Sequence, residues 1–295
     1  MTQGIINRLS TTRTRDVVFV VDAFGHYHDQ FLMFKESLSR TELAHLDFLV
    51  YNEQDLSNML VGVMPKFYVQ SKQYFESVAL RMQGFHELAL LGYENIYYFD
   101  LDCILMPHFN VGMESKYSVY TTQCFGAVNY RSSIMGRDNI YPNGGFILGY
   151  GPNIRKFKGV VGLLSDWISF LKMDNRESQL VDEEYIKLIG YTSLPRILNA
   201  QPQVVAGTQL YPETDAMMYH YMWISKPSNY TCEEQAQSML QIIKSIDYAP
   251  YIDVYMSIID SGVVFSDPFV KSVEGFFRSP TVLGSVDNID PSFKL

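Results

Sequence analysis

Three short apolar runs separated by helical patterns constrain the fold of this chain more than any other feature. Residues 16–22 read Asp-Val-Val-Phe-Val-Val-Asp, the uninterrupted hydrophobic pattern of a strand that is buried on both faces. Residues 46–51 and 95–100 are two further runs rich in strand-forming side chains. Amphipathic spacing predicts a helix over residues 28–40 and a longer helix over residues 71–91. This alternation predicts an α/β fold with a mostly parallel central sheet flanked by helices.

The pattern becomes mixed after Pro107. Gly92 fits the end of the long helix, where glycine is favoured. We expect a strand pair over residues 117–127, and a turn at residues 141–145 that leads into a strand at 146–149. The sequence predicts four further helices, over residues 153–170, 183–188, 233–246 and 268–277. Since no repeat or linker divides the chain, we expect one main domain, residues 1–230, with a C-terminal helical extension, residues 231–295, packed on it.

Composition excludes several classes of protein. The chain has 295 residues, of which 47% are hydrophobic and 19% charged, so it can bury a sizeable core and is not a disordered chain. The formal net charge of −9 argues against a nucleic-acid partner. An acidic protein that binds a diphosphate needs a metal or a local cation, so the charge balance favours a metal-dependent site.

The chain carries no signal for a membrane or for secretion. No apolar run approaches the ~20 residues of a transmembrane helix. The first residues lack the apolar stretch of a secretory signal. Cys103, Cys124 and Cys232 are odd in number and form no Cys-x-x-Cys pair, so neither a disulfide framework nor a zinc cage is expected. We therefore predict a cytoplasmic protein.

The segment Asp100-Leu101-Asp102 is the most informative candidate site. Ligands of open α/β sheets bind beyond the carboxyl ends of the strands, which is where this segment follows the run at 95–100. Side chains two residues apart on extended backbone point the same way, so both carboxylates can converge on one cation. Their hard oxygens suit Mg²⁺ or Mn²⁺. The alternative is that the two acids only end a strand in a solvated turn.

A second enzyme class also places Asp-x-Asp after an apolar strand. Phosphotransferases of the haloacid-dehalogenase type carry the motif near the N-terminus and follow it with a small or hydroxyl residue. Here Cys103 and Ile104 follow the motif, and two predicted strands precede it. The sequence therefore favours a different class.

Three further motifs accompany the two acids. The four are Asp100-Leu101-Asp102, Asn143-Gly144-Gly145-Phe146, Asp182-Glu183, and His220 with Lys226-Pro227. Together they resemble the motifs of the retaining GT-A glycosyltransferases, a family that includes glycogenin, lipopolysaccharide galactosyltransferases and the glucosyltransferase domain of collagen lysyl hydroxylases. The resemblance extends over residues 17–227. The last motif is the most specific, because the histidine and the Lys-Pro pair keep the family's spacing. Trp223 stands where the family usually has glycine, which puts the path of that loop beside the phosphate in doubt.

The resemblance implies a GT-A, Rossmann-like fold and assigns roles to several residues. His220 would complete the shell of Mn²⁺ or Mg²⁺ with Asp100 and Asp102, and Lys226 would contact the diphosphate. Asp182 and Glu183 would touch the sugar or the acceptor, or one of them would act as base in an inverting enzyme; both also read as surface charges of a helix. The remaining donor-binding predictions are Asp22, Ala23, Phe24, Arg81, Leu101, Asn143, Gly144 and Gly145. Asp22 also fits a turn cap, and Arg81 a salt-bridged helix face.

The reaction that follows from this resemblance is transfer of a hexose or pentose from a nucleoside-diphosphate sugar, with a UDP-linked donor expected. The acceptor is a hydroxyl of a glycan, a protein or a small molecule, and retention is favoured. Two alternatives are a sugar-1-phosphate nucleotidyltransferase and a non-catalytic nucleotide- or carbohydrate-binding protein. The first normally has a Gly-rich basic loop after its first strand, which residues 23–26 lack. We expect residues 231–295 to shape the acceptor site or a homodimer contact.

Overall fold

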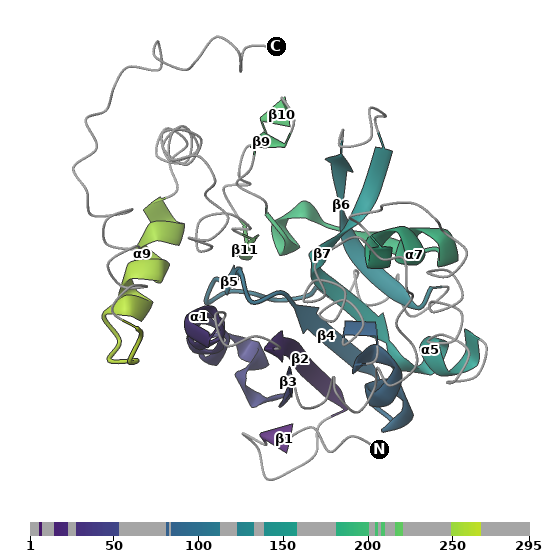
Figure 1. The fold of residues 1–295 in the computed structure, drawn as a ribbon, viewed down its shortest axis with the longest axis horizontal. Coiled ribbons are helices and arrows are strands. Elements are labelled where there is room, and N and C mark those ends of the chain that lie inside the picture. Colours follow the sequence, from purple (N-terminus) through teal and green to yellow (C-terminus); the bar gives the residue numbers. More distant parts are fainter. Residues whose placement is uncertain are drawn as a thin grey trace, which may run out of the picture.

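The fold is seen in a computed structural model, and Figure 1 shows its arrangement. The structure describes residues 6–7, 15–22, 28–52, 81–82, 84–112, 123–132, 139–157, 181–200, 204–205, 208–209, 216–220 and 249–266. Among these described parts, no helix combines the length and the apolar character needed to cross a membrane.

A seven-stranded sheet forms the centre of the molecule, with the spatial order β1-β3-β2-β4-β7-β6-β8 (Figure 1). Its strands are β1 (Ile6–Asn7), β2 (Asp16–Asp22), β3 (Asp47–Asn52), β4 (Asn95–Phe99), β6 (Phe125–Ser132), β7 (Asn139–Tyr150) and β8 (Thr192–Leu194). The pairs β2–β3, β2–β4 and β6–β8 are parallel, whereas β7 is antiparallel to both β4 and β6, and β1 is antiparallel to β3. All strands except β1 and β7 therefore point the same way, so the predicted mostly parallel α/β sheet is confirmed.

The predicted burial of the first strand on both faces is also confirmed. Val17, Phe19 and Val21 belong to one hydrophobic cluster, and Val18 and Val20 to a second cluster. Strand side chains alternate between faces, so these two clusters are the two sides of the sheet.

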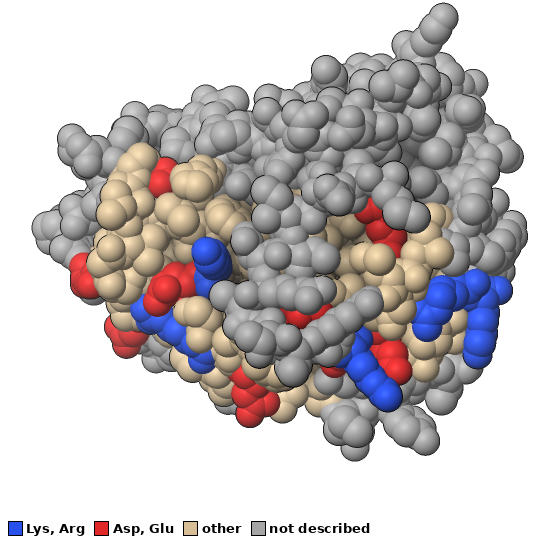
Figure 2. All heavy atoms as spheres, turned by 90° about the horizontal axis from the view of Figure 1, so that it is seen from below, with Lys and Arg blue, Asp and Glu red and all other residues tan. Residues whose placement is uncertain are grey.

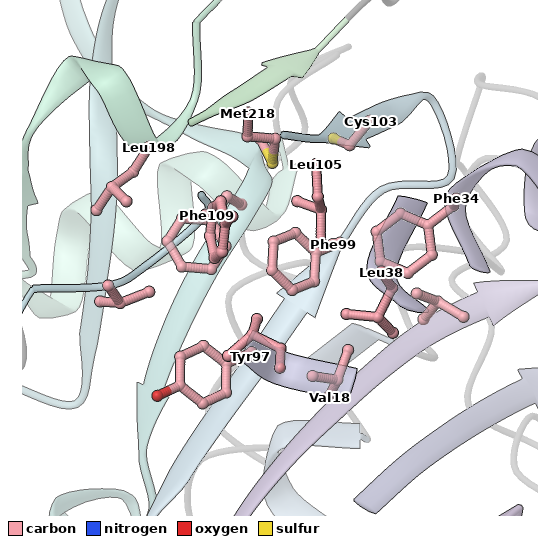
Figure 3. Packing of buried hydrophobic residues seen from close by; sticks show 14 of the residues in the cluster. Val18, Phe34, Leu38, Tyr97, Phe99, Cys103, Leu105, Phe109, Leu198 and Met218 are labelled. Atoms are coloured by element: carbon pink, nitrogen blue, oxygen red, sulfur yellow. The ribbon is translucent and has the colours of Figure 1, made fainter. Parts of the chain in front are cut away.

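Helices cover both sides of the sheet. Helical residues 84–90, α5 (Gly151–Phe157) and α7 (Val181–Ile189) contribute to the first cluster through Phe85, Ile154 and Ile186. Phe34 and Leu38 of α1 (His28–Ser39) belong to the second cluster, which Figure 3 shows with Val18, Tyr97 and Phe99. The predicted helix end at Gly92 is confirmed, since this glycine has φ +92°, a conformation that other residues rarely adopt.

One predicted turn is wrong. Residues 141–145 do not form a turn but lie within β7, which runs unbroken from Asn139 to Tyr150. This half of β7 pairs only with β6, because its pairing with β4 begins at Phe146. The register with β6 shifts near Asn129, the partner of Pro142, so a residue without an N–H fits there.

The other expected elements agree where the structure describes them. The helix expected over 153–170 begins earlier, at Gly151, and only its first seven residues, α5, are described. Helical residues 81–82 and 84–90 belong to the long helix predicted over 71–91. The helices predicted over 233–246 and 268–277 lie outside the described residues, as do most residues of the predicted pair at 117–127.

A small second sheet lies beyond the end of β4. Its strands β5 (Cys103–Leu105) and β11 (Met218–His220) are antiparallel, with His220 opposite Cys103. The structure also describes two 3-10 helices, η2 (Glu42–His45) and η3 (Arg196–Leu198), and a pair of short antiparallel strands, β9 (Val204–Val205) and β10 (Thr208–Gln209).

The sequence did not predict the helix α9 (Ala249–Ile259), which packs against α1. Ile258 and Phe265 join Met33 of α1 and Ile104 of β5 in a third hydrophobic cluster. Arg40 donates a hydrogen bond to the Ser257 hydroxyl at 2.7 Å, a second link between the two helices. The division of the chain at residue 230 stays a prediction, although α9 is in contact with the larger part.

Candidate metal centre and donor site

Asp100 leaves the end of β4 with one carboxylate oxygen already engaged. Its Oδ1 accepts hydrogen bonds from Arg81 Nη2, at 2.7 Å, and from the Tyr98 hydroxyl. The Arg81 guanidinium also lies 4.5 Å from the centre of the Tyr98 ring. Burial raises the pKa of the Tyr98 phenol well above its usual value; Arg81 opposes this shift and Asp100 adds to it. Tyr98 therefore stays a hydrogen-bond donor, and the other carboxylate oxygen, Oδ2, remains directed at the site.

His220 brings an imidazole to both acids. Pairing of β11 with β5 sets His220 opposite Cys103, next to Asp102 in the chain. Its Nε2 lies 3.2 Å from Asp102 Oδ1 and 3.9 Å from Asp100 Oδ2. Only 3% of the His220 side chain and 6% of the Asp102 side chain are exposed, whereas 24% of Asp100 is exposed. The three predicted metal ligands thus meet, with Asp100 on the open side.

Two glycines of β7 make the room that these side chains need. A Cβ on Gly145 would lie 2.2 Å from His220 Nδ1 and 2.5 Å from its Cε1, closer than real contacts allow. A Cβ on Gly144 would lie 2.5 Å from Arg81 Nη1. The backbone of Gly145 also accepts a hydrogen bond from the Asp100 N–H at 3.0 Å. The Gly-Gly pair is therefore a steric requirement of the site.

Asn143 connects this strand to the histidine. Its Oδ1 accepts from the Gly145 N–H at 2.9 Å and from Asn199 Nδ2 at 2.5 Å, and it lies 3.0 Å from His220 Nδ1. Only 3% of Asn143 is exposed. The sequence predicted Asn143 as a donor-binding residue, but its amide oxygen is directed into the protein, toward the imidazole.

Glu183 lies on the other side of the glycines. It belongs to α7, is buried, and accepts a hydrogen bond from the Gly144 N–H at 2.7 Å. Glu183 is therefore no surface charge. It bonds to the backbone of Gly144, the glycine that also makes room for Arg81. Asp182 lies in the same helix, but its side chain is outside what the structure describes.

Three carboxylates and one imidazole gather at the site. Asp100 and Asp102 converge on His220, and Glu183 lies nearby, on the Gly144 N–H. The carboxylate oxygens and the imidazole nitrogen are the donor atoms that Mn²⁺ or Mg²⁺ takes, and a divalent ion favours the ionised state of neighbouring carboxylates. The residues present therefore fit the implied cation.

Cys103 is also close to this centre. One ligand atom each from Asp102, Cys103 and His220 lies within 4.8 Å of the others. However, the thiol of Cys103 donates to the Gly145 carbonyl at 3.3 Å, so it is protonated and directed at the backbone. Hard cations also prefer oxygen to sulfur. Asp100 rather than Cys103 is thus the third ligand that the chemistry favours.

Several predicted residues are placed only in part. Leu101 is buried between the two acids in the chain. The backbone of Asp22 ends β2 at the same edge of the sheet as Asp100, but its side chain is not described. Ala23, Phe24 and Lys226 lie outside the described residues, so their donor-binding roles stay predictions.

Sequence reasoning missed Tyr98, Asn199 and Cys103 as neighbours of the site. The alternation of strand side chains offers a signal for Tyr98, which is two residues before Asp100 and so shares its face. Asn199 follows η3 and shows no local signal, because its role depends on a contact with Asn143 across the fold.

Charged side chains on the face seen in Figure 2 do not form a wide basic area among the described residues. Blue and red side chains lie interspersed there, in keeping with the formal net charge of −9.

Comparison with known proteins identifies the fold. No protein-family model matches the sequence, and no curated protein is similar to it at a significant level. The structure, by contrast, is similar to mouse xyloside xylosyltransferase 1, with a TM-score of 0.51 and 13% identity over 70% of this chain and 98% of that one. It is also similar to the galactosyltransferase LgtC, solved with donor and acceptor sugar analogues, with a TM-score of 0.50 and 13% identity over 87% of this chain and 99% of that one. The chain thus has the GT-A fold of glycosyltransferases.

Proposed function

We propose that this protein is a metal-dependent glycosyltransferase that moves a sugar from a nucleoside-diphosphate sugar, UDP-linked, to a hydroxyl acceptor with retention of configuration. The observation that carries the proposal is the convergence of His220 Nε2 on Asp102 Oδ1, at 3.2 Å, and on Asp100 Oδ2, at 3.9 Å. Asp100, Asp102 and His220 would hold Mn²⁺ or Mg²⁺. When bound, the cation supplies the positive charge that stabilises a departing diphosphate.

The chain's own residues divide the remaining work. Arg81 and Tyr98 hold Oδ1 of Asp100 and so fix the rotamer that directs Oδ2 at the cation. Lys226, expected at the diphosphate from its motif, adds a second positive charge to the leaving group. Glu183 is held by the Gly144 N–H at the position where the donor sugar is expected.

The bond changes are those of a front-face displacement. The bond between the anomeric carbon and the phosphate oxygen breaks, and the acceptor oxygen bonds to the same face of that carbon. The acceptor proton passes to the departing phosphate oxygen, so no protein base is required. Because the acceptor displaces the phosphate directly, no protein nucleophile is required either. A cytoplasmic location is part of this proposal, because the three widely spaced cysteines suit a reducing compartment.

A thermal-shift screen of nucleotide sugars with and without Mn²⁺ tests the proposal. A ligand present at 100 times its Kd stabilises the native state by about 2.7 kcal/mol, a readily measured shift. We expect one UDP-sugar to stabilise the protein only with Mn²⁺, and mass spectrometry to detect sugar transfer or slow hydrolysis of that donor. Absence of any metal-dependent donor would refute the proposal.

Matched variants localise the effect. Asp102→Asn and His220→Ala should abolish the metal-dependent shift. His86→Ala removes a histidine that is also buried but lies on the helix preceding β4, so it should lower the basal Tm without affecting the metal-dependent shift. If His220→Ala and His86→Ala behave alike, the assignment of the ligands is wrong.

A further inference from the structure

We infer that Asn143 and Asn199 are positioning residues that fix which nitrogen of His220 carries the proton, and that they thereby set the affinity of the site for its cation. The inference rests on the metal site proposed above, but its central claim concerns the metal-free protein and is tested there. Sequence analysis assigned no role to Asn199 and predicted that Asn143 contacts the donor.

The backbone of Gly145 determines the orientation of the Asn143 amide. An amide oxygen and nitrogen look alike in shape, so their assignment depends on their hydrogen-bond partners. A backbone N–H can only donate, and the nitrogen of Gly145 lies 2.9 Å from one terminal atom of the Asn143 amide. The Asn143 atom that faces Gly145 is therefore the oxygen.

The same oxygen then determines the tautomer of His220. Nδ1 of the ring lies 3.0 Å from Asn143 Oδ1, a hydrogen-bond distance between two atoms of which the oxygen can only accept. Nδ1 must therefore carry a proton. In the neutral imidazole this leaves the lone pair on Nε2, which is the atom that faces Asp102 and Asp100. This is the state that a metal ligand requires.

Asn199 completes the arrangement. Its Nδ2 donates to the same oxygen at 2.5 Å, from a residue of which only 3% is exposed. Asn199 is itself held by the second sheet, because the next residue, Ala200, donates its N–H to the Met218 carbonyl and accepts from the His220 N–H, both at 2.9 Å. Asn199, which donates to Asn143, and His220 thus lie on two backbone segments that are hydrogen-bonded to each other. Rotation of the Asn143 amide would break the bonds from both Gly145 and Asn199.

Two isosteric substitutions that add the same charge separate this inference from a general electrostatic effect. Asn143→Asp keeps an oxygen toward Gly145, Asn199 and His220, so the Kd for Mn²⁺ should stay within about threefold of the parent value or fall below it. Asn199→Asp puts a carboxylate oxygen against the Asn143 oxygen, so the amide turns and Nδ1 loses its acceptor. The Kd should then rise roughly 10- to 100-fold, although the added negative charge alone would lower it. Asn143→Leu, which has no acceptor, should give a similar loss.

Nitrogen NMR of the metal-free protein at pH 8 reads the tautomer directly. In protein labelled with ¹⁵N-histidine, the His220 signal is assigned by its loss in His220→Ala. We expect Nδ1 of His220 to be the protonated nitrogen in the parent and in Asn143→Asp. In Asn143→Leu and Asn199→Asp, the proton should move to Nε2, where it can be donated to Asp102. Asn95→Leu is the control, because Asn95 is similarly buried at the opposite end of β4, with its amide bonded to Asp16, and its loss should change stability without changing the tautomer or the Kd.

The outcomes distinguish the two proposals. An Nε2–H tautomer in the parent, or equal effects of the two aspartate substitutions on the Kd, would overturn the inference. An Nδ1–H tautomer in a parent that binds no Mn²⁺ or other divalent cation would uphold the tautomer claim, remove the claim on affinity, and refute the proposed function instead.

Discussion

Gly145→Ala is the substitution whose effect on the site follows most directly from the geometry. The new methyl group would lie 2.2 Å from His220 Nδ1, 2.5 Å from Cε1 and 2.8 Å from Cγ. Reaching an ordinary contact of 3.4 Å requires a displacement of about 1.2 Å, and the packed interior resists it. The ring is confined by Asn143 on one side and Asp102 on the other.

The magnitude follows from that displacement. Metal–ligand distances are fixed to within about 0.2 Å, so a ring moved this far cannot coordinate in its present position. We expect the affinity for Mn²⁺ to fall at least 10- to 100-fold and the free energy of unfolding to fall by about 1–3 kcal/mol from overpacking. Isothermal titration calorimetry and urea unfolding of the metal-free protein measure the two quantities.

A double-mutant cycle tests the cause. In the His220→Ala background the space of the imidazole is vacant, so Gly145→Ala should cost at least about 1 kcal/mol less there than in the parent. Gly112→Ala is the matched control, because a Cβ at Gly112 meets nothing within 4 Å. Equal costs of Gly145→Ala in both backgrounds, together with unchanged Mn²⁺ binding, would refute the steric argument.

Three further predictions concern single groups. Gly92→Ala should lower the free energy of unfolding by about 1–2 kcal/mol in chemical denaturation, without changing the affinity for Mn²⁺. The cost comes from the φ of +92° alone, because no atom lies within 4 Å of the added Cβ. Tyr98→Phe should leave the number of tyrosines that ionise near pH 10 unchanged in a spectrophotometric titration of the native protein. The reason is that burial holds the pKa of Tyr98 well above that range. One fewer ionising tyrosine in the variant would contradict this. Burial raises the pKa of the Cys124 thiol from 9.0 to about 11. This residue should therefore contribute stability that is present below pH 9 and is lost as the pH rises toward 11. In pH-dependent urea unfolding, Cys124→Ser should lose less stability over that window than the parent protein does.

The sheet was predictable because its signals are local. The run at residues 16–22 forms β2 with those bounds, since its central residues 17–21 are buried on both faces of the sheet and are all apolar. Asp100 and Asp102 were predictable for a related reason, because the end of a parallel strand in an α/β fold is where ligands bind. His220 was found only through its motif, since nothing in β11 shows that it pairs with β5.

The path of β7 was not predictable from local propensity. Proline, asparagine and two glycines in succession are typical of a turn, and the sequence was interpreted in that way. In the structure they form a strand, in which Gly144 and Gly145 provide space for Arg81 and His220, and Asn143 Oδ1 lies within hydrogen-bond distance of His220 Nδ1. The local preference and the requirement of the site disagree, as expected where function rather than stability selects the residues.

The helix α9 was missed for a different reason. Residues 249–259 carry tyrosines, isoleucines and a valine that favour strands as strongly as helices. Its position depends on contacts with Met33 of α1 and with Arg40, the residue after α1, both far away in the sequence.

The second sheet connects the candidate metal centre to a hydrophobic cluster that lies away from the ligands. One side of β5 and β11 presents Ile104 and Tyr219 to Ile258 of α9, while the adjacent residue His220 faces the acids. A bound cation would join two stretches of chain that lie far apart in the sequence, around Asp102 and His220, and so oppose unfolding of both at once. Ile258→Ala would weaken this packing. The affinity for the cation would then report how tightly α9 packs against the second sheet.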